Sequence, residues 1–596
     1  MTKNYTDEKN IQYLIAFLKE YNIRKVVASP GTTNLSFVAS IQYDPYFEIF
    51  SCVDERSAAY MAVGLSEESG EAVVITCTGA TASRNYLPAL TEAYYRKIPV
   101  LVVTGTKNEE RIGHLENQLI DRRIAPNDAI VHREYVYSIK DDEDIYYCQL
   151  KLNIALNALY RHGGGPVHIN LQTRYSRDFS VKKLPEVRRI NYYTYKDVDK
   201  MPEIPNGRVG IFIGSHPTFT EEQTLAIDQF CASYNAVVFC DHTSGYYGKY
   251  KYNFGLVGSQ KYASYPQIAN LDLCIHIGEV SGEYSALSIL KKKTVWRVSE
   301  DGEFKDTFRR LACVFEMTEK DFFSYYSKEL GIEEGSESYL ELCKKTYKEL
   351  YEKIPDLPFS NVWIASQLHT KFPVGSSVHF GILNSLRSWN LFQLPDGVVS
   401  FGNVGGFGID GCMSSMIGAS LVNPNKLFFG IFGDLSFFYD MNSVGNRHVG
   451  NNIRILLVNN GRGQEFRNFY HTGSLFGEDA DKYIAAGGHF GAQSPMLVKH
   501  YAEDLGYEYM SATTKDEFLT NSSRFMSADK YDRPIIFEVF TDTKDESDAL
   551  LATWSIEKSS GDFVIGKAID ALGGKKAVIN LIGKKNIAFF KKFFKR

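Results

Sequence analysis

The segment Gly433-Asp434-Leu435-Ser436-Phe437, followed downstream by Asn459-Asn460-Gly461-Arg462-Gly463, decides the fold. An apolar run over 427–432 ends at Gly433-Asp434, and a second over 453–458 ends at Asn459-Asn460. Short apolar runs that stop at Gly, Asn or Asp are typical of buried parallel strands. Because ligands collect at the carboxyl ends of such strands, we expect Asp434 and Asn460 to lie side by side.

These two strand ends offer oxygen ligands of the kind that Mg²⁺ prefers. One carboxylate, one amide oxygen and a nearby backbone carbonyl leave further positions for phosphate oxygens. Either dipeptide alone is better explained by an ordinary turn after a strand. The pair, each member closing a buried run, favours a metal site.

Composition places the chain among globular α/β proteins. It has 596 residues, 44% hydrophobic and 23% charged, enough for three domains. The net charge of −5 gives no reason to expect nucleic acid as a partner, and nine scattered cysteines fit reduced thiols. With no signal peptide or membrane-spanning run visible in the sequence, we expect a cytoplasmic protein.

Apolar runs alternate with helical patterns along most of the chain, which predicts doubly wound parallel sheets. We expect a first α/β domain over residues 1–185, a linker and central α/β domain over 186–350, a third domain over 351–545 and a basic tail over 546–596. In the central domain Gly210 and Gly214 suggest a nucleotide fold, but no G-x-G-x-x-G fingerprint follows, which favours a spacer without a cofactor.

The pattern of Gly433-Asp434, about 25 residues and then Asn459-Asn460 resembles the diphosphate–metal motif of thiamine diphosphate-dependent enzymes. The resemblance implies three parallel-sheet domains, thiamine diphosphate and Mg²⁺ as cofactors, and a metal held by the side chains of Asp434 and Asn460 and the backbone carbonyl of Arg462. The implied cofactor-binding residues are Pro30, Gly31, Thr78, Asn85, Gly408, Ile409, Asp410, Gly433, Asp434, Leu435, Ser436, Asn460 and Phe466.

The first domain carries the second anchor, Glu55. The segment 53–64 resembles the one that holds the activating glutamate of this family. The match implies that Glu55 hydrogen-bonds the aminopyrimidine ring of the cofactor from a dry pocket, where desolvation should raise its pKa. The plainer alternative is a first-turn glutamate that complements the helix dipole.

Within the family, segments 78–89, 117–120 and 408–411 look most like the menaquinone-pathway synthases, with acetolactate synthases more distant. By that match Gln118 faces the substrate. These synthases use arginines to bind a dicarboxylic oxoacid and its acceptor, but this chain has Thr33, Val404 and Leu421 at the matching places. Losing such carboxylate clamps is not conservative, and it argues against the menaquinone intermediate as product.

Glu465 is a further departure, because the family usually has an apolar side chain there. Either Phe466 supports the cofactor instead, or Glu465 acts near the substrate. The candidate substrate contacts are Thr32, Thr33, Arg84, Arg462 and Glu465, and the other cations weighed are Arg467, His448 and His471, with Arg462 favoured.

We therefore predict decarboxylation of a 2-oxoacid with transfer of the acyl-anion equivalent to an acceptor. The alternatives are an acetolactate-synthase-like or substituted-pyruvate decarboxylase and, from another class, an inactive scaffold of the same fold. The resemblance implies sites across the interface of a homodimer or homotetramer. The tail has nine Lys/Arg between residues 565 and 596, so it either contacts an anionic membrane, docks a partner or stays solvated.

Overall fold

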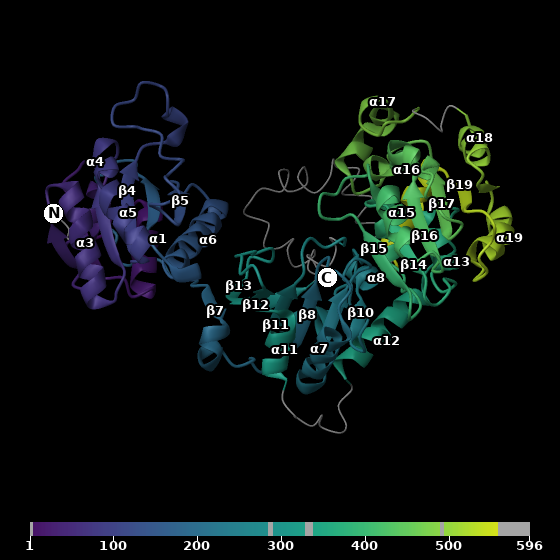
Figure 1. Ribbon diagram of the computed structural model, residues 1–596, viewed down its shortest axis with the longest axis horizontal. Coiled ribbons are helices and arrows are strands. Elements are labelled where there is room, and N and C mark those ends of the chain that lie inside the picture. Colours follow the sequence, from purple (N-terminus) through teal and green to yellow (C-terminus); the bar gives the residue numbers. More distant parts are fainter. Residues whose placement is uncertain (1–3, 284–289, 328–337, 489–493, 558–596) are drawn as a thin grey trace, which may run out of the picture. The chain divides into compact units, whose positions relative to one another are not determined.

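The computed structural model describes residues 4–283, 290–327, 338–488 and 494–557. It contains three sheets, each combined with helices, and so confirms three parallel-sheet α/β domains (Figure 1). Contacts divide the chain into two compact units, residues 1–196 with 303–314 and residues 197–302 with 315–596. The predicted domain limits at 185/186 and 350/351 stay predictions.

The first sheet has the order β2-β1-β3-β4-β6-β5, and its pairings are all parallel. Its strands are β1 (Lys25–Ala28), β2 (Glu48–Ser51), β3 (Val73–Cys77), β4 (Val100–Thr106), β5 (His132–Val136) and β6 (Val167–Gln172). Its helices are α1 (Lys9–Glu20), α2 (Leu35–Ile41), α3 (Glu55–Ser69), α4 (Thr81–Asn85), α5 (Leu87–Arg96) and α6 (Asp142–Ala158).

Alternation along these strands sends side chains to two cores. Val26 and Val74 pack with the apolar faces of α1 and α6, whereas Val27 and Ile75 pack with α3 and α5. A strand covered on both faces is apolar throughout, which is why β3 and β4 read as continuous apolar runs.

The second sheet has the order β10-β9-β8-β11-β12-β13-β7. Its strands are β7 (Asn191–Thr194), β8 (Val209–Ile213), β9 (Val237–Cys240), β10 (Lys251–Asn253), β11 (Asn270–Ile277), β12 (Lys291–Ser299) and β13 (Leu311–Glu316). The helices in this part of the chain are α7 (Glu221–Tyr234), α8 (Gly255–Gly258), α9 (Pro266–Ala269), α11 (Glu319–Tyr326) and α12 (Tyr339–Tyr351). The pairings from β10 to β12 are parallel.

The third sheet has the order β15-β14-β16-β17-β19-β18, all parallel, which repeats the strand order of the first. Its strands are β14 (Ser377–Phe380), β15 (Val399–Gly402), β16 (Phe428–Gly433), β17 (Ile453–Asn459), β18 (Glu508–Ala512) and β19 (Ile535–Phe540). The helices are α13 (Asn361–Leu368), α14 (Asn384–Asn390), α15 (Cys412–Val422), α16 (Asp434–Asp440), α17 (Ala480–Tyr483), α18 (Leu497–Asp504), α19 (Lys515–Met526) and α20 (Thr543–Trp554).

This strand order creates a topological switch point beside the first strand of the sheet. β14 lies between β15 and β16, so the connections leave it toward opposite sides. In open α/β sheets the ligand crevice lies at the carboxyl ends of the strands at such a point. The predicted Asp434 follows β16 directly, so it lies at this crevice.

The end of the described chain belongs to the third sheet's domain. The predicted limit at 545/546 falls inside α20, whose Glu546 is 1% exposed. Its carboxylate accepts hydrogen bonds from the backbone N–H of Asn361 at 3.0 Å and from Thr541 Oγ1 at 2.8 Å. The third domain therefore continues to Trp554, because α20 is held to α13 through a buried side chain.

The basic tail predicted from residue 565 onward lies outside the described residues. Among the residues that are described, no helix is both long and apolar enough to cross a membrane.

Glu546 makes the stability of this domain depend on pH. Burial raises its pKa to about 7, although its hydrogen bonds act in the opposite direction. In the unfolded chain the carboxyl group releases its proton at the ordinary pKa of 4.5. Between pH 4.5 and about pH 7 the folded state therefore binds one proton more than the unfolded state. Stability therefore falls as pH rises from about 4.5 to about 7, by on the order of 3 kcal/mol.

We expect Glu546→Gln, which stays neutral, to lose this dependence. Urea unfolding at pH 5 and pH 8 should show the variant gaining stability over the wild type only at the higher pH. Asp548→Asn, at an exposed position on the same helix, is the control and should not alter the difference. An equal pH response in wild type and Glu546→Gln would contradict the assignment.

Candidate functional site

A cavity lies at the carboxyl ends of β14, β16 and β17. Predicted residues that line it are Ile409, Gly433, Asp434, Leu435, Ser436, Asn460, Arg462, Glu465 and Phe466. Other lining residues, which the sequence analysis missed, are Asn361, Ile382, Leu383, Asn384, Ser385, Val458, Gly463 and Gln464. Strand ends more than twenty residues apart in the chain thus converge on one hollow, as the motif predicts.

Asp434 is almost fully buried in this cavity, at 4% exposed. Burial raises the pKa of its carboxyl to about 7, while hydrogen bonds from the backbone N–H groups of Leu435, Gly461 and Arg462 partly oppose the rise. The Leu435 N–H lies 3.0 Å from Asp434 Oδ1. A carboxylate in such a place is stabilised by a cation, because opposite charge favours its ionised form.

The two asparagines that follow β17 have different roles. Asn459 is buried, donates from Nδ2 to Glu538 Oε1 at 2.7 Å, and accepts at Oδ1 from the Gly461 N–H at 3.1 Å, so it shapes the turn. The buried Oδ1 of Asn460 has no hydrogen-bond partner. An orphaned acceptor beside a buried carboxylate is the arrangement that an oxygen-liganded cation would satisfy.

The residues present therefore fit Mg²⁺ with a diphosphate. No cluster of three or more His, Cys, Asp or Glu suited to a metal occurs in the described part of the chain. The predicted metal ligands do not require such a cluster, because Asp434 is the only one of them that is a His, Cys, Asp or Glu. Ser436 Oγ donates to the Ile409 carbonyl at 2.9 Å, which ties the glycine-rich loop to the start of α16, and Asp410 is exposed on that loop.

Arg462 and Glu465 both have ionic partners. Arg462 Nη1 lies 2.5 Å from Asp481 Oδ2, and Arg467 pairs with the same carboxylate. Glu465 pairs with Arg387 of α14, a residue that the sequence analysis did not single out. The favoured replacement cation, Arg462, is thus already matched by a carboxylate.

The loop that leads into α14 has an unusual backbone. Leu383 has φ 63° and ψ −120°, and Asn384 follows it in the cavity wall. Ala80, after β3 of the first sheet, has nearly the same conformation, φ 61° and ψ −133°. Such positive φ values cost about 1–3 kcal/mol in residues other than glycine and cluster at binding sites. The strand-end rule could have found Asn384, since it follows β14 closely.

In the first unit Glu55 begins α3, where the Asp54 side chain caps the helix by accepting from the N–H groups of Arg56 and Ser57. Asn85 Nδ2 donates to Glu55 Oε2 at 3.3 Å, so two predicted residues meet. Glu55 is half-buried within this chain alone, so the dry pocket that the resemblance implies is not complete here.

Thr33 is buried, and its hydroxyl is hydrogen-bonded within the fold. Its hydroxyl lies 2.8 Å from Thr78 Oγ1, donates to the Gly105 carbonyl at 3.1 Å and accepts from the Gly79 N–H at 3.0 Å. These bonds connect the turn after β1 with the loop after β3 and the end of β4, and the role of Thr33 as a substrate contact stays a prediction. Thr32 beside it is exposed.

Gly31 lies where the turn after β1 meets Thr78, because a Cβ there would come within 2.6 Å of Thr78 Cβ. Pro30 is exposed beside it. Pro30 and Gly31 line a hollow together with Ser29 and Asn34. The other predicted residues of this unit, Glu55 and Asn85, follow the strands β2 and β3.

Gln118 and Arg84 lie near the loop after β3. Gln118 is exposed, with φ 56°, and its carbonyl oxygen would be 3.2 Å from a Cβ placed on Gly79. Arg84 donates from Nη2 to the Asp121 carbonyl at 2.9 Å.

His168 lies 2.7 Å from Thr104 Oγ1, and burial lowers its pKa well below 6.5, consistent with a structural histidine.

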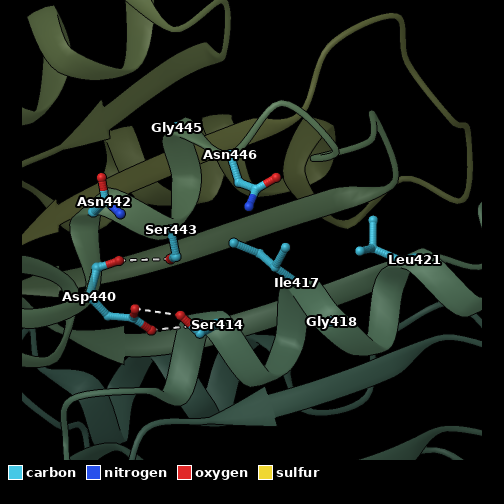
Figure 2. Close-up of a pocket in the computed structure, with 9 residues that line it drawn as sticks. All are labelled: Ser414, Ile417, Gly418, Leu421, Asp440, Asn442, Ser443, Gly445 and Asn446. Carbon is cyan, nitrogen blue, oxygen red and sulfur yellow. Dashed lines mark hydrogen bonds between the residues drawn. The ribbon is translucent and has the colours of Figure 1, made fainter.

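The other positions where the resemblance suggests arginines are apolar. Val404 is 2% exposed, and Leu421 lines a second pocket together with Ser414 and Ile417 of α15 (Figure 2). The opposite wall of that pocket runs from Asn442 to Asn446. Asp440 also lines this pocket, and its carboxylate accepts hydrogen bonds from the Ser414 N–H at 2.7 Å and the Ser414 hydroxyl at 2.6 Å.

Comparison with known proteins agrees with this geometry. Residues 9–124 match the family described as "Thiamine pyrophosphate enzyme, N-terminal TPP binding domain", a segment that contains Glu55, Thr78, Asn85 and Gln118. A 2-succinyl-5-enolpyruvyl-6-hydroxy-3-cyclohexene-1-carboxylate synthase of Bacteroides fragilis is 30% identical over 568 residues, 90% of this chain and 97% of the relative.

Synthases of the same name in Phocaeicola vulgatus and Christiangramia forsetii are 29% and 25% identical, each over 92% of this chain and 98% of the relative. Similarity thus extends across all three sheets and includes both predicted halves of the site. The chain belongs to the thiamine diphosphate-dependent enzyme family.

Proposed function

We propose that this protein is a thiamine diphosphate- and Mg²⁺-dependent carboligase. It decarboxylates a 2-oxoacid and transfers the resulting acyl-anion equivalent to an acceptor. The observation that carries the proposal is the unpartnered Asn460 Oδ1 beside the buried Asp434 in a cavity at the switch point of the third sheet. When bound, the cofactor would supply a nucleophilic carbon and an electron sink for loss of CO₂.

The protein's own residues bind, orient and transfer protons. Asp434, Asn460 and the Arg462 carbonyl would hold Mg²⁺, and the glycine-rich loop around Gly408 would hold the cofactor's phosphates. Leu435 and Phe466 supply the apolar wall. Glu55 holds a proton against the cofactor's pyrimidine ring, and Asn85 orients its carboxyl group.

A second copy of the chain completes each site. Glu55 is only half-buried in its own unit, whereas its role requires a site without water. We infer a homodimer, alone or paired into a tetramer, in which Glu55 of one copy meets the Asp434 cavity of the other.

The substrates differ from those of the menaquinone-pathway synthases. The relatives' name describes a cyclohexene carboxylate synthase, but Thr33, Val404 and Leu421 offer no cation where that group is expected to bind carboxylates. Val404 is apolar and buried, and the Thr33 hydroxyl is hydrogen-bonded to the Gly105 carbonyl, so neither side chain supplies a positive charge for a carboxylate.

Cofactor binding should appear as stabilisation. Thiamine diphosphate with Mg²⁺ at a hundredfold excess over Kd should stabilise the protein by about 2.7 kcal/mol, seen as a raised unfolding midpoint. Asn460→Ala and Asp434→Asn should lose most of this shift, and so should the wild type with EDTA. Asn442→Ala, in the neighbouring pocket, is the control that keeps it. No shift in the wild type would refute the cofactor assignment.

Glu55→Gln should lower CO₂ release from 2-oxoacids by about a hundredfold or more, because the residue holds the proton for the cofactor ring. Cofactor-induced stabilisation should survive, since the diphosphate and metal contacts lie elsewhere. Glu68→Gln, exposed on the same helix, should retain activity. Full turnover by Glu55→Gln would rule out the role given to Glu55.

Mixing two inactive variants tests the shared site. In a mixed dimer of Glu55→Gln and Asp434→Asn chains, one of the two sites combines an intact Glu55 with an intact Asp434. Refolded or co-expressed mixtures should therefore recover about a quarter of wild-type CO₂ release, by random pairing under mass action. If both residues acted within one chain, the mixture would stay inactive.

A further inference from the structure

The Arg387–Glu465 ion pair reaches the wall of the cofactor cavity through Glu465. Glu465 lines the cavity, and Arg387 comes from α14, whose first residue, Asn384, also lines it. The two side chains are 12% and 13% exposed. Tyr470 joins the pair by donating its hydroxyl to Glu465 Oε2 at 2.8 Å, and its ring stacks on Trp554 at 5.1 Å.

This ion pair matches the charge of Arg387 with a carboxylate, and Arg387 Nη1 donates to both Glu465 and the Tyr470 hydroxyl. Burial alone would lower the pKa of Arg387, but Glu465 and Tyr470 outweigh that effect and raise it, so the guanidinium stays charged and matched. Removing one member of a buried ion pair is destabilising, because the other charge is left uncompensated. The pair therefore behaves as a neutral, fixed part of the wall.

Among the described residues that line the cavity, no unpaired side-chain cation is left for a second carboxylate of the substrate. Of the described residues that line it, Arg462 is the one cation, and it is paired with Asp481. Asp434 and Glu465 are acidic. A second substrate carboxylate against this wall would be desolvated without an unpaired side-chain cation to compensate it, and it would lie near the negative charge of Glu465.

Apolar side chains make up much of the rest of the wall, as they do in many small-molecule sites. They are Ile382, Leu383, Leu435, Val458 and Phe466. Leu421 likewise presents an uncharged side chain to the second pocket (Figure 2). A short alkyl group can be buried against such a surface.

We propose that the Arg387–Glu465 pair determines donor specificity: it selects a 2-oxoacid with a small uncharged side chain, such as pyruvate, and rejects one with a second carboxylate. This inference rests on the proposed decarboxylation and names its substrate class. Glu465 supplies the rejection by matching Arg387, which would otherwise be a ready receptor for a carboxylate.

The test measures CO₂ release by the holoenzyme, with thiamine diphosphate and Mg²⁺, from pyruvate, 2-oxobutyrate and 2-oxoglutarate. The wild type should use pyruvate or 2-oxobutyrate with kcat/KM at least tenfold above that for 2-oxoglutarate. Glu465→Gln keeps the shape but frees the Arg387 charge, so it should raise the 2-oxoglutarate/pyruvate ratio of kcat/KM at least tenfold, mainly through KM.

The double variant Arg387→Met/Glu465→Gln separates charge from shape. Without the cation it should again reject 2-oxoglutarate. Glu508→Gln is the control. It breaks the surface ion pair between Glu508 of β18 and Arg524 of α19 and should leave the ratio unchanged. Stabilisation by the cofactor shows that each variant retains a folded site.

If the wild type prefers 2-oxoglutarate to pyruvate, the inference is wrong but the proposed decarboxylation stands. This comparison of two substrates needs no variant. A folded Glu465→Gln with an unchanged ratio would also overturn it. No CO₂ from any 2-oxoacid, by a wild type that binds the cofactor, would refute the proposed function and the inference together.

Discussion

The burial of the Asp434 carboxylate at the end of β16 is the constraint on which the third sheet's site depends. A carboxylate removed from water disfavours its ionised form, and backbone N–H groups compensate for this only in part. The neighbouring strand end places the uncompensated Oδ1 of Asn460 close by, while Asn459 fixes the turn through Glu538. A divalent cation would satisfy both oxygens at once, so local electrostatics and the family resemblance lead to the same proposal.

The sequence could predict those parts of the site that follow from local pattern. Asp434 and Asn460 each close an apolar run, and parallel strands bring their carboxyl ends to one edge, so their convergence on one cavity needed no tertiary information. The three-sheet architecture followed from the same alternation of strands and helices. Glu55 was found by resemblance, because its position at a helix start has a plain alternative as a dipole-complementing residue.

Contacts across large sequence separations could not be predicted in this way. Arg387 and Glu465 are 78 positions apart, and neither lies in a pattern that indicates the other. Thr33 was considered as a substrate contact because it stands where the resembled synthases have an arginine. Its hydroxyl connects segments that meet only in the folded sheet, the loop after β3 and the end of β4. Glu546 was assigned to the tail because the contacts that hold α20 are made with residues of distant helices. Local sequence pattern does not indicate such contacts.

Helix α20 also decides where the gene can be shortened for expression or crystallisation. Its Ser547 hydroxyl accepts the Phe469 N–H at 3.0 Å, and Trp554 stacks on Tyr470, so the helix supports the cavity wall from behind. A stop codon placed at residue 545 would remove these supports together with Glu546. A boundary after Glu557 keeps them all, which makes that position the natural junction for a purification tag or a fused reporter protein.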